Sequence, residues 1–209
     1  MQPSSILVII LALVLFLGAF ILIKTMLFTR KSSTAIIPFE YGIPRFKQDP
    51  QTLAEHLSSV IQIETISHED PKKDKKENLK KMQEQLASLY PLVHKNLTRE
   101  VVDGYSLIYT WKGSNPDLNP VVFMAHQDVV PADEHTLDQW TYPPFSGKIA
   151  DGFIWGRGTL DIKSQVIAIL ESAEALLAAK YKPERTVILT FSHNEEVLGT
   201  GAKAVVDHL

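Results

Sequence analysis

Three short clusters of residues that can bind a metal occur in the second half of the sequence. The first is His126-Gln127-Asp128, the second places Asp161 at the end of a glycine-rich turn, and the third contains the adjacent pair Glu195-Glu196. Imidazole and carboxylate groups are ligands of zinc and related cations. The chain has no cysteine, which excludes thiolate zinc sites, cysteine nucleophiles and disulfides. Any bound metal must therefore be held by histidine and carboxylate side chains.

The spacing inside each cluster gives each residue a possible task. In extended backbone, residues two apart project to the same side, so the Asp128 carboxylate can accept a hydrogen bond from the His126 ring and fix its tautomer. The two oxygens of Asp161 can bridge two cations that are about 3.5 to 4 Å apart. Of two adjacent glutamates, one can bind a metal while its neighbour removes a proton from water.

Each cluster also has a purely structural interpretation. A histidine at a strand end can be structural, Asp161 can cap the helix that follows it, and Glu195-Glu196 can be a solvated surface pair. We expect His193 to be structural. A serine hydrolase that uses Ser164 or Ser192 is disfavoured, because neither serine lies in a Gly-x-Ser-x-Gly turn.

The apolar pattern predicts the elements that position these clusters. Strand-type runs occur near Val101 and at 106–111, 121–125, 153–155 and 187–191, and helical periodicity occurs from residue 51, from residue 79 and over 162–179. This alternation predicts an α/β fold with a mostly parallel sheet sandwiched by helices. The run at 121–125 is apolar throughout, which predicts a central strand covered on both faces. The clusters then follow strand ends or begin a helix, where open α/β sheets bind ligands.

The N-terminal segment predicts a single-pass membrane anchor. Residues 6–23 are an unbroken apolar run, which as a helix extends roughly 27 Å and can span a bilayer. A cleaved signal peptide is the alternative, but no Lys or Arg precedes the run and no small-x-small site follows it. A buried core helix is disfavoured because the run has no polar face. We predict an anchor at 5–24, a linker at 25–50 and a catalytic region at 51–209.

The charges of the chain bear on its binding partners and on its side of the membrane. The net charge is -3 and there is no large basic patch, so nothing favours a nucleic-acid partner. Lys24, Arg30 and Lys31 follow the span, and the positive-inside rule would leave the catalytic region in the cytoplasm. Asn96-Leu97-Thr98 is an N-glycosylation sequon, which matters only in a eukaryotic lumen.

Taken together, the clusters resemble the zinc metallopeptidase family that contains carboxypeptidase S, aminoacylase and glutamate carboxypeptidase. The resemblance rests on four segments in order, HQDVVP, W-x-Y-P-P-F-S-G, DGFIWGRGTLDIK and NEEVLGTGA. It covers residues 51–209 and is nearest to the branch of carboxypeptidase S and the N-acyl-amino-acid hydrolases.

The resemblance implies a hydrolase with two zinc ions, or manganese or cobalt, that cleaves an amide bond beside a free carboxylate in a small peptide or N-acyl amino acid. His126 and Glu196 would each bind one metal, and Asp161 would bridge both. Asp128 would orient His126, and Glu195 would be the general base. The resemblance also implies a cis peptide bond after Asp161, a homodimer of the full-length protein, and an extracytoplasmic or lumenal catalytic region, against the charge bias.

Two departures from the family pattern stand out. Ile162 replaces an aspartate that family members often have, and the sequence ends at Leu209, before the further acidic ligand, the distant histidine and the lid domain. Each metal then has only two protein ligands, fewer than the three typical of catalytic zinc. We therefore expect a piece of a longer protein, with weak metal binding and little activity by itself. The alternative is a membrane-tethered pseudoenzyme or interaction module without catalysis.

Overall fold

The computed structural model describes residues 3–32 and 48–209. These residues form two units, which are described separately: helix α1 (Pro3–Ser32) and the folded region 48–209. Helix α1 continues past the expected end of the anchor at residue 24. Most of the linker expected at 25–50 lies outside the described residues.

Over residues 6–23, helix α1 is apolar on all sides. Its segment Ser5–Leu27 has a mean hydropathy of 3.5 and is long and apolar enough to cross a membrane, a test that an N-terminal signal sequence also passes. The side chains of this segment are exposed. An apolar surface all round suits a lipid environment better than water.

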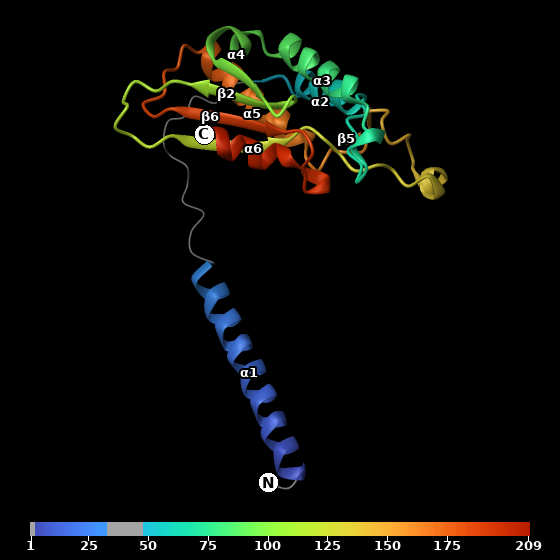
Figure 1. Ribbon diagram of the computed structural model, residues 1–209, viewed down its shortest axis with the longest axis vertical. Coiled ribbons are helices and arrows are strands. Elements are labelled where there is room, and N and C mark those ends of the chain that lie inside the picture. Colours follow the sequence, from blue (N-terminus) through green and yellow to red (C-terminus); the bar gives the residue numbers. More distant parts are fainter. Residues whose placement is uncertain (1–2, 33–47) are drawn as a thin grey trace. The chain divides into compact units, whose positions relative to one another are not determined.

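The folded region is built on a four-stranded mixed sheet with the strand order β1-β2-β6-β3 (Figure 1). Strands β1 (Thr98–Val102) and β2 (Ser106–Trp111) form an antiparallel hairpin, and β2 is also antiparallel to β6 (Val187–Ser192). Only the pair of β6 with β3 (Val121–His126) is parallel. The prediction of a mostly parallel sheet is therefore wrong. The short turn that contains Asp103-Gly104, both with positive φ, permits only an antiparallel return of the chain.

Strand β3 is not the covered central strand that its composition predicts. Among the described residues it pairs only with β6 and lies at the edge of the sheet. Its residues Val122, Phe123 and Met124 are 42%, 49% and 60% exposed. An apolar run shows that a strand can pack against apolar neighbours. It does not show whether those neighbours belong to the same sheet, to a helix or to another part of the protein.

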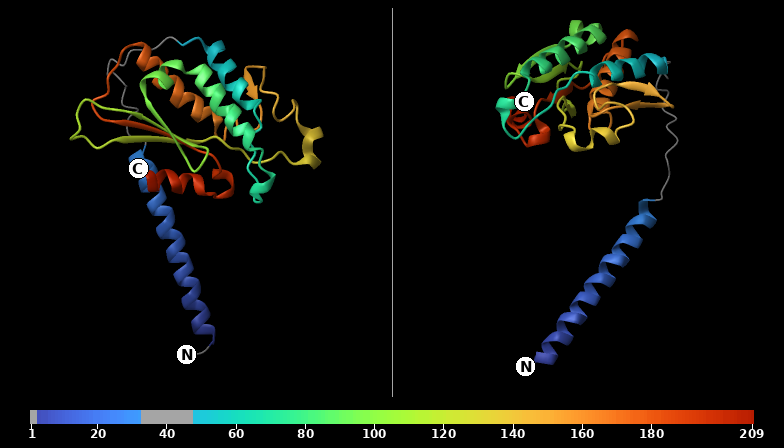
Figure 2. Two further views of the ribbon diagram at one scale, coloured as in Figure 1. Left: turned by 45° about the horizontal axis from the view of Figure 1, so that its top comes forward. Right: turned by 90° about the vertical axis from the view of Figure 1, so that its right-hand side faces the viewer.

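Helices lie on both faces of the sheet, as expected from the sequence (Figure 2). One face is covered by α2 (Pro50–Ile61), α3 (Lys76–Leu89), α4 (Pro91–Asn96) and α5 (Lys163–Ala178), and the other by α6 (Thr200–His208). Helices α2, α3 and α5 match the predicted periodic segments. Helices α4 and α6 are additional short elements that the sequence pattern did not indicate.

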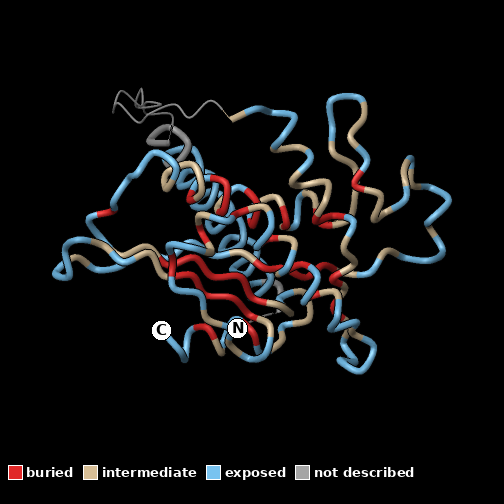
Figure 3. The backbone as a smooth tube through the Cα atoms, turned by 90° about the horizontal axis from the view of Figure 1, so that it is seen from above, coloured by how far each residue is buried: buried red, intermediate tan, exposed pale blue. Residues whose placement is uncertain are grey.

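The main hydrophobic core lies between the sheet and helices α2 to α5. Alternate residues of β2 and β6 face this core, namely Leu107, Tyr109, Leu189 and Phe191. Ile108 and Ile188 point to the other face, where they contact Val205 of α6, because successive strand residues project to opposite sides. The buried stretches, red in Figure 3, run through the middle of the sheet.

A long connection joins β3 to α5 and carries the glycine turn. It contains the 3-10 helix η2 (Glu134–Gln139) and a hairpin of β4 (Lys148–Ala150) and β5 (Phe153–Trp155). Two further 3-10 helices are η1 (Pro71–Lys73) and η3 (Glu195–Val197). The expected short strand before the glycine turn is β5. The connection brings residues 156–162 back to the carboxyl end of β3.

Candidate metal centre

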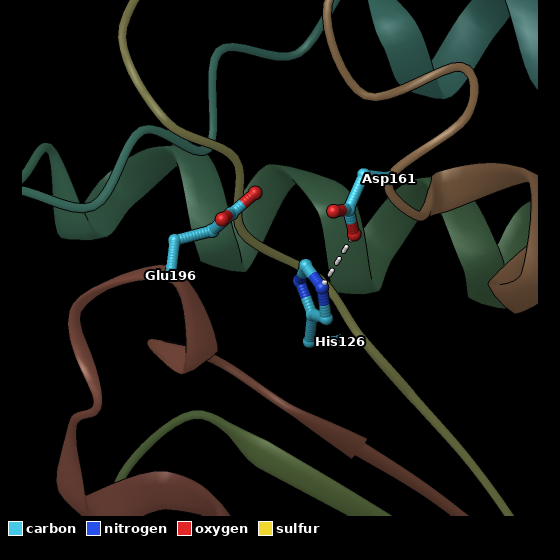
Figure 4. Close-up of side chains that lie close together, drawn as sticks. All are labelled: His126, Asp161 and Glu196. Carbon is cyan, nitrogen blue, oxygen red and sulfur yellow. Dashed lines mark hydrogen bonds and ion pairs between the residues drawn. The ribbon is translucent and has the colours of Figure 1, made fainter. Parts of the chain in front are cut away.

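His126, Asp161 and Glu196 lie together in the folded structure (Figure 4). One ligand atom from each side chain lies within 4.8 Å of the other two. His126 is the last residue of β3, Asp161 belongs to the loop before α5, and Glu196 lies in η3 after β6. The three clusters identified in the sequence therefore converge on one place.

The parallel pair β3 and β6 explains why the first and third clusters meet. His126 pairs with Ser192 in the register of the two strands, so their carboxyl ends lie side by side and the following loops share one edge of the sheet. The His126 ring is buried, and its Nδ1 lies 3.0 Å from the backbone oxygen of Asp128 and 3.2 Å from Oδ1 of the same residue. A proton on Nδ1 leaves Nε2 free to face the carboxylates.

Asp128 holds two parts of the site at once. Its side chain is fully buried, and its carboxylate oxygens accept hydrogen bonds from the backbone N–H groups of Glu195 at 3.0 Å and Glu196 at 3.1 Å. Burial acts to raise the pKa of Asp128, but the hydrogen bonds from His126, Ser67 and the two backbone amides together lower it below its ordinary value. The contact with His126 agrees with the sequence prediction, and the contacts with η3 are an addition to it.

The two adjacent glutamates occupy different positions. Glu196 is partly buried and belongs to the group with His126 and Asp161. Burial and the nearby charge of Asp161 raise its pKa. The Glu195 side chain is 51% exposed, and its Oε2 lies 3.6 Å from His126 Nε2. Glu195 therefore flanks the group from the solvent side.

Asp161 is not the cap of the following helix. The N-cap residue of α5 is Ile162, which makes no side-chain capping hydrogen bond. The Asp161 side chain is 75% exposed, and its Oδ1 lies 3.1 Å from His126 Nε2. The peptide bond between Asp161 and Ile162 is cis, as the family resemblance implies. The structural alternative for Asp161 is thus not supported.

The charges around His126 favour a cation. Burial acts to lower the pKa of the His126 ring, but the hydrogen bonds and charge of Asp128 and the charge of Glu195 outweigh it and raise the pKa to about 9. Four carboxylates, those of Asp128, Asp161, Glu195 and Glu196, thus surround one imidazole. One nitrogen donor and several oxygen donors suit zinc, manganese or cobalt, and a bound cation would offset the excess negative charge.

Sequence reasoning missed two polar residues that support the site. The fully buried Gln127 donates from Nε2 to the backbone oxygens of Tyr105 and Phe191, both at 2.9 Å. Lys163 is also fully buried, directly after the Asp161 loop. The sequence signal that could have indicated them is their position close to a predicted ligand, since Gln127 lies between His126 and Asp128 and Lys163 is two residues after Asp161. His193 bonds Ser106 Oγ through Nδ1 at 2.8 Å, in keeping with the structural role expected for it.

The part of the chain that carries these residues is similar to known proteins. Residues 122–209, which hold all three clusters, match the family model described as Peptidase family M20/M25/M40. Carboxypeptidase S of Saccharomyces cerevisiae is 36% identical over 184 residues, 82% of this chain and 32% of the relative. The N-fatty-acyl-amino acid synthase/hydrolase PM20D1 of Homo sapiens is 40% identical over 161 residues, 76% of this chain and 31% of the relative.

A solved structure supports the fold. Human carnosine dipeptidase 1 aligns with a TM-score of 0.61 and 22% identity, over 76% of this chain and 35% of that one. This chain spans about a third of the length of the relatives it matches. Residues 122–209 are thus similar in sequence to the peptidase family M20/M25/M40, and the folded region shares its fold with a dipeptidase of known structure.

Proposed function

We propose that this chain supplies part of the active site of a metal-dependent hydrolase that cleaves a peptide or N-acyl amide bond beside a free carboxylate. The observation that carries this proposal is the convergence of His126, Asp161 and Glu196 within 4.8 Å. The names of the relatives, a carboxypeptidase and an N-fatty-acyl-amino acid synthase/hydrolase, support this class of substrate.

His126 and Glu196 would each bind one of two zinc ions, and Asp161 would bind both. Manganese and cobalt suit the same donors. When bound, such ions polarise the substrate carbonyl and make water a better nucleophile at neutral pH. Asp128 keeps the His126 ring in the orientation that presents Nε2 to the metal.

Glu195 would act as the general base. Its carboxylate lies beside the ligand group without belonging to it, and its exposed side leaves room for water and substrate. It removes a proton from the attacking water and then delivers that proton to the nitrogen of the departing amine. Glu195 thus accepts and returns the same proton, and it ends the reaction in its starting state.

Two substitutions separate these roles in the full-length gene product. Glu195→Gln should abolish hydrolysis of an N-acyl amino acid and leave the bound metal, measured by plasma mass spectrometry, unchanged. Glu196→Gln should lose metal as well as activity. Glu184→Gln, at an exposed glutamate outside the site, is the control and should change neither quantity.

The opposite pattern would exchange the two roles. Protein that holds no metal in any of these forms would sink the hydrolase proposal. That result would instead favour the membrane-tethered module without catalysis, because such a module needs no zinc.

We also propose that α1 anchors the chain in a membrane, with the catalytic region extracytoplasmic or lumenal. The apolar span Ser5–Leu27 supports anchoring. Retention in the membrane after carbonate extraction would test the anchor against a cleaved signal. Asn96 is exposed, so glycosylation at its sequon, or protease protection in sealed vesicles, would test the side. Homodimerisation of the full-length protein stays a prediction, which light scattering can measure.

A further inference from the structure

Lys163 is a lysine in the interior of the protein, where lysines are rarely found. It begins helix α5, and its side chain is fully buried. Its Nζ donates hydrogen bonds to the backbone oxygens of Val60 at 2.9 Å and Ile63 at 2.6 Å. Burying a polar group is costly unless its hydrogen bonds are made, so a fully buried lysine that contacts main-chain carbonyls calls for an explanation.

The two carbonyls lie at the carboxyl end of α2. Val60 is in the last turn of this helix, and Ile63 follows the C-cap residue Gln62. Carbonyls at a helix end lack the full set of intrahelical donors and carry the negative end of the helix dipole. Lys163 supplies donors to this end from a helix that starts 100 residues after Ile63.

The main chain of Lys163 closes the loop that contains Asp161. Its backbone N–H donates to the Gly158 oxygen at 2.9 Å. Its aliphatic stem passes beside the same glycine, since a Cβ placed on Gly158 would lie 3.5 Å from Lys163 Cδ. The loop is therefore held both by its own turn and by a connection to α2.

Asp161 depends on this backbone for its position. Its side chain is 75% exposed, and the described part of the chain gives it one contact, with His126 Nε2 at 3.1 Å. Ile162 adds no capping bond. Among the hydrogen bonds of the described residues, those of Lys163 are the nearest in sequence to Asp161 that join the loop to the end of helix α2.

We propose that Lys163 is a positioning residue of the metal centre, which holds the Asp161 carboxylate opposite His126 by fastening the loop to the end of α2. The effect of Lys163 on metal binding rests on the proposed function. Its effect on the Asp161 loop can be tested without a metal. If Lys163 only capped α2, its replacement would leave the order of the Asp161 loop unchanged.

The test compares Lys163→Met with Asn78→Leu in the full chain in detergent. Methionine keeps an unbranched side chain, one atom shorter than that of lysine, and removes the amine that makes both hydrogen bonds. Asn78 of helix α3 donates from Nδ2 to the Glu64 oxygen at 2.8 Å. Its replacement therefore removes a hydrogen bond to the segment that follows α2, next to Ile63, but at a place away from the Asp161 loop. The readouts are hydrogen exchange of the segment 156–163 without metal, zinc affinity, and the visible spectrum of bound Co²⁺.

Lys163→Met should speed exchange of the segment at least about tenfold, weaken zinc binding roughly 10- to 100-fold and alter the Co²⁺ spectrum. Asn78→Leu should leave all three unchanged. Exchange in Lys163→Met as slow as in the unmodified chain would overturn the inference. If that variant does not fold, Lys163→Leu, which removes the donor and has a shorter apolar side chain, is measured in the same way, and unchanged exchange there overturns it. An unmodified chain that binds no zinc would refute the metal centre, while the exchange result would still decide the role of Lys163.

Discussion

Replacing Asp128 with asparagine would test whether one buried carboxylate organises both halves of the metal centre. The two oxygens of Asp128 each accept one backbone N–H, from Glu195 and from Glu196. Asparagine has a single acceptor oxygen, so its amide NH₂ must face one of these N–H groups and leave it unsatisfied. A lost bond to a charged acceptor together with an unpaired buried donor costs about 2 to 4 kcal/mol.

The substitution should also weaken metal binding. Without the carboxylate, the His126 ring loses the charge that lies 3.2 Å from its Nδ1, and η3 loses its anchor. Loss of such an orienting group costs roughly 10- to 100-fold in metal affinity. Both effects therefore have the same origin and should appear together.

The assay is urea unfolding followed by tryptophan fluorescence, with zinc affinity measured by competition with a chromophoric chelator. All three tryptophans lie in the folded region, so helix α1 does not contribute to the signal. Asp133→Asn is the matched control, since Asp133 caps the exposed helix η2 through the His135 N–H at 3.0 Å and should cost well under 1 kcal/mol. An Asp128→Asn protein as stable and as zinc-binding as this control would refute the reasoning.

The remaining predictions concern pH, a glycine and the core. Despite burial, the hydrogen bonds and charge of Asp128 raise the pKa of His126 to about 9, so zinc must displace a proton at neutral pH. Apparent zinc affinity should rise about tenfold per pH unit from about pH 6.5 to 9 and be lost as pH falls, and an affinity that is flat from pH 7 to 8.5 would contradict this. Gly158→Ala should lower the free energy of unfolding by about 2 kcal/mol or more, because φ is +88° and the new Cβ would lie 2.6 Å from a neighbouring side chain. The control Gly152→Ala, with φ +78° and open space around it, should cost about 1 kcal/mol. Equal costs of the two substitutions in urea unfolding would argue against close packing at Gly158. Phe191→Ala should cost about 3 to 5 kcal/mol, since the ring is fully buried, and a loss below about 1.5 kcal/mol would show that the core can close over it.

Local patterns in the sequence predicted most elements of the folded region. The apolar positions of α2 and α3 recur with helical spacing, and Val60, Met82 and Leu86 are buried as this spacing requires. The strand runs at 106–111 and 187–191 correspond to β2 and β6. Such periodicity works because each element must place its apolar side chains on the face that meets the core.

Strand direction and strand neighbours could not be predicted in the same way. Both depend on contacts between distant segments, and an apolar run such as 121–125 has the same composition in the centre of a sheet and at its edge. The meeting of His126 with Glu196 follows from one parallel pair, which the alternation of elements did suggest. The contacts of Asp128 with η3 and of Lys163 with α2 join residues far apart in sequence, and no local pattern encodes them.

The exposed edge of β3 has a practical consequence for handling the protein. Free N–H and C=O groups along an apolar edge strand invite pairing with other chains, and proteins commonly guard such edges with charge, proline or a cover. Here the protection is slight, since Gln165 Nε2 bonds the Met124 oxygen at 2.9 Å while Phe123 beside it stays half exposed. Concentrated samples of residues 48–209 by themselves should therefore aggregate through this strand, and Phe123→Lys should improve their solubility without altering the side chains of the metal centre.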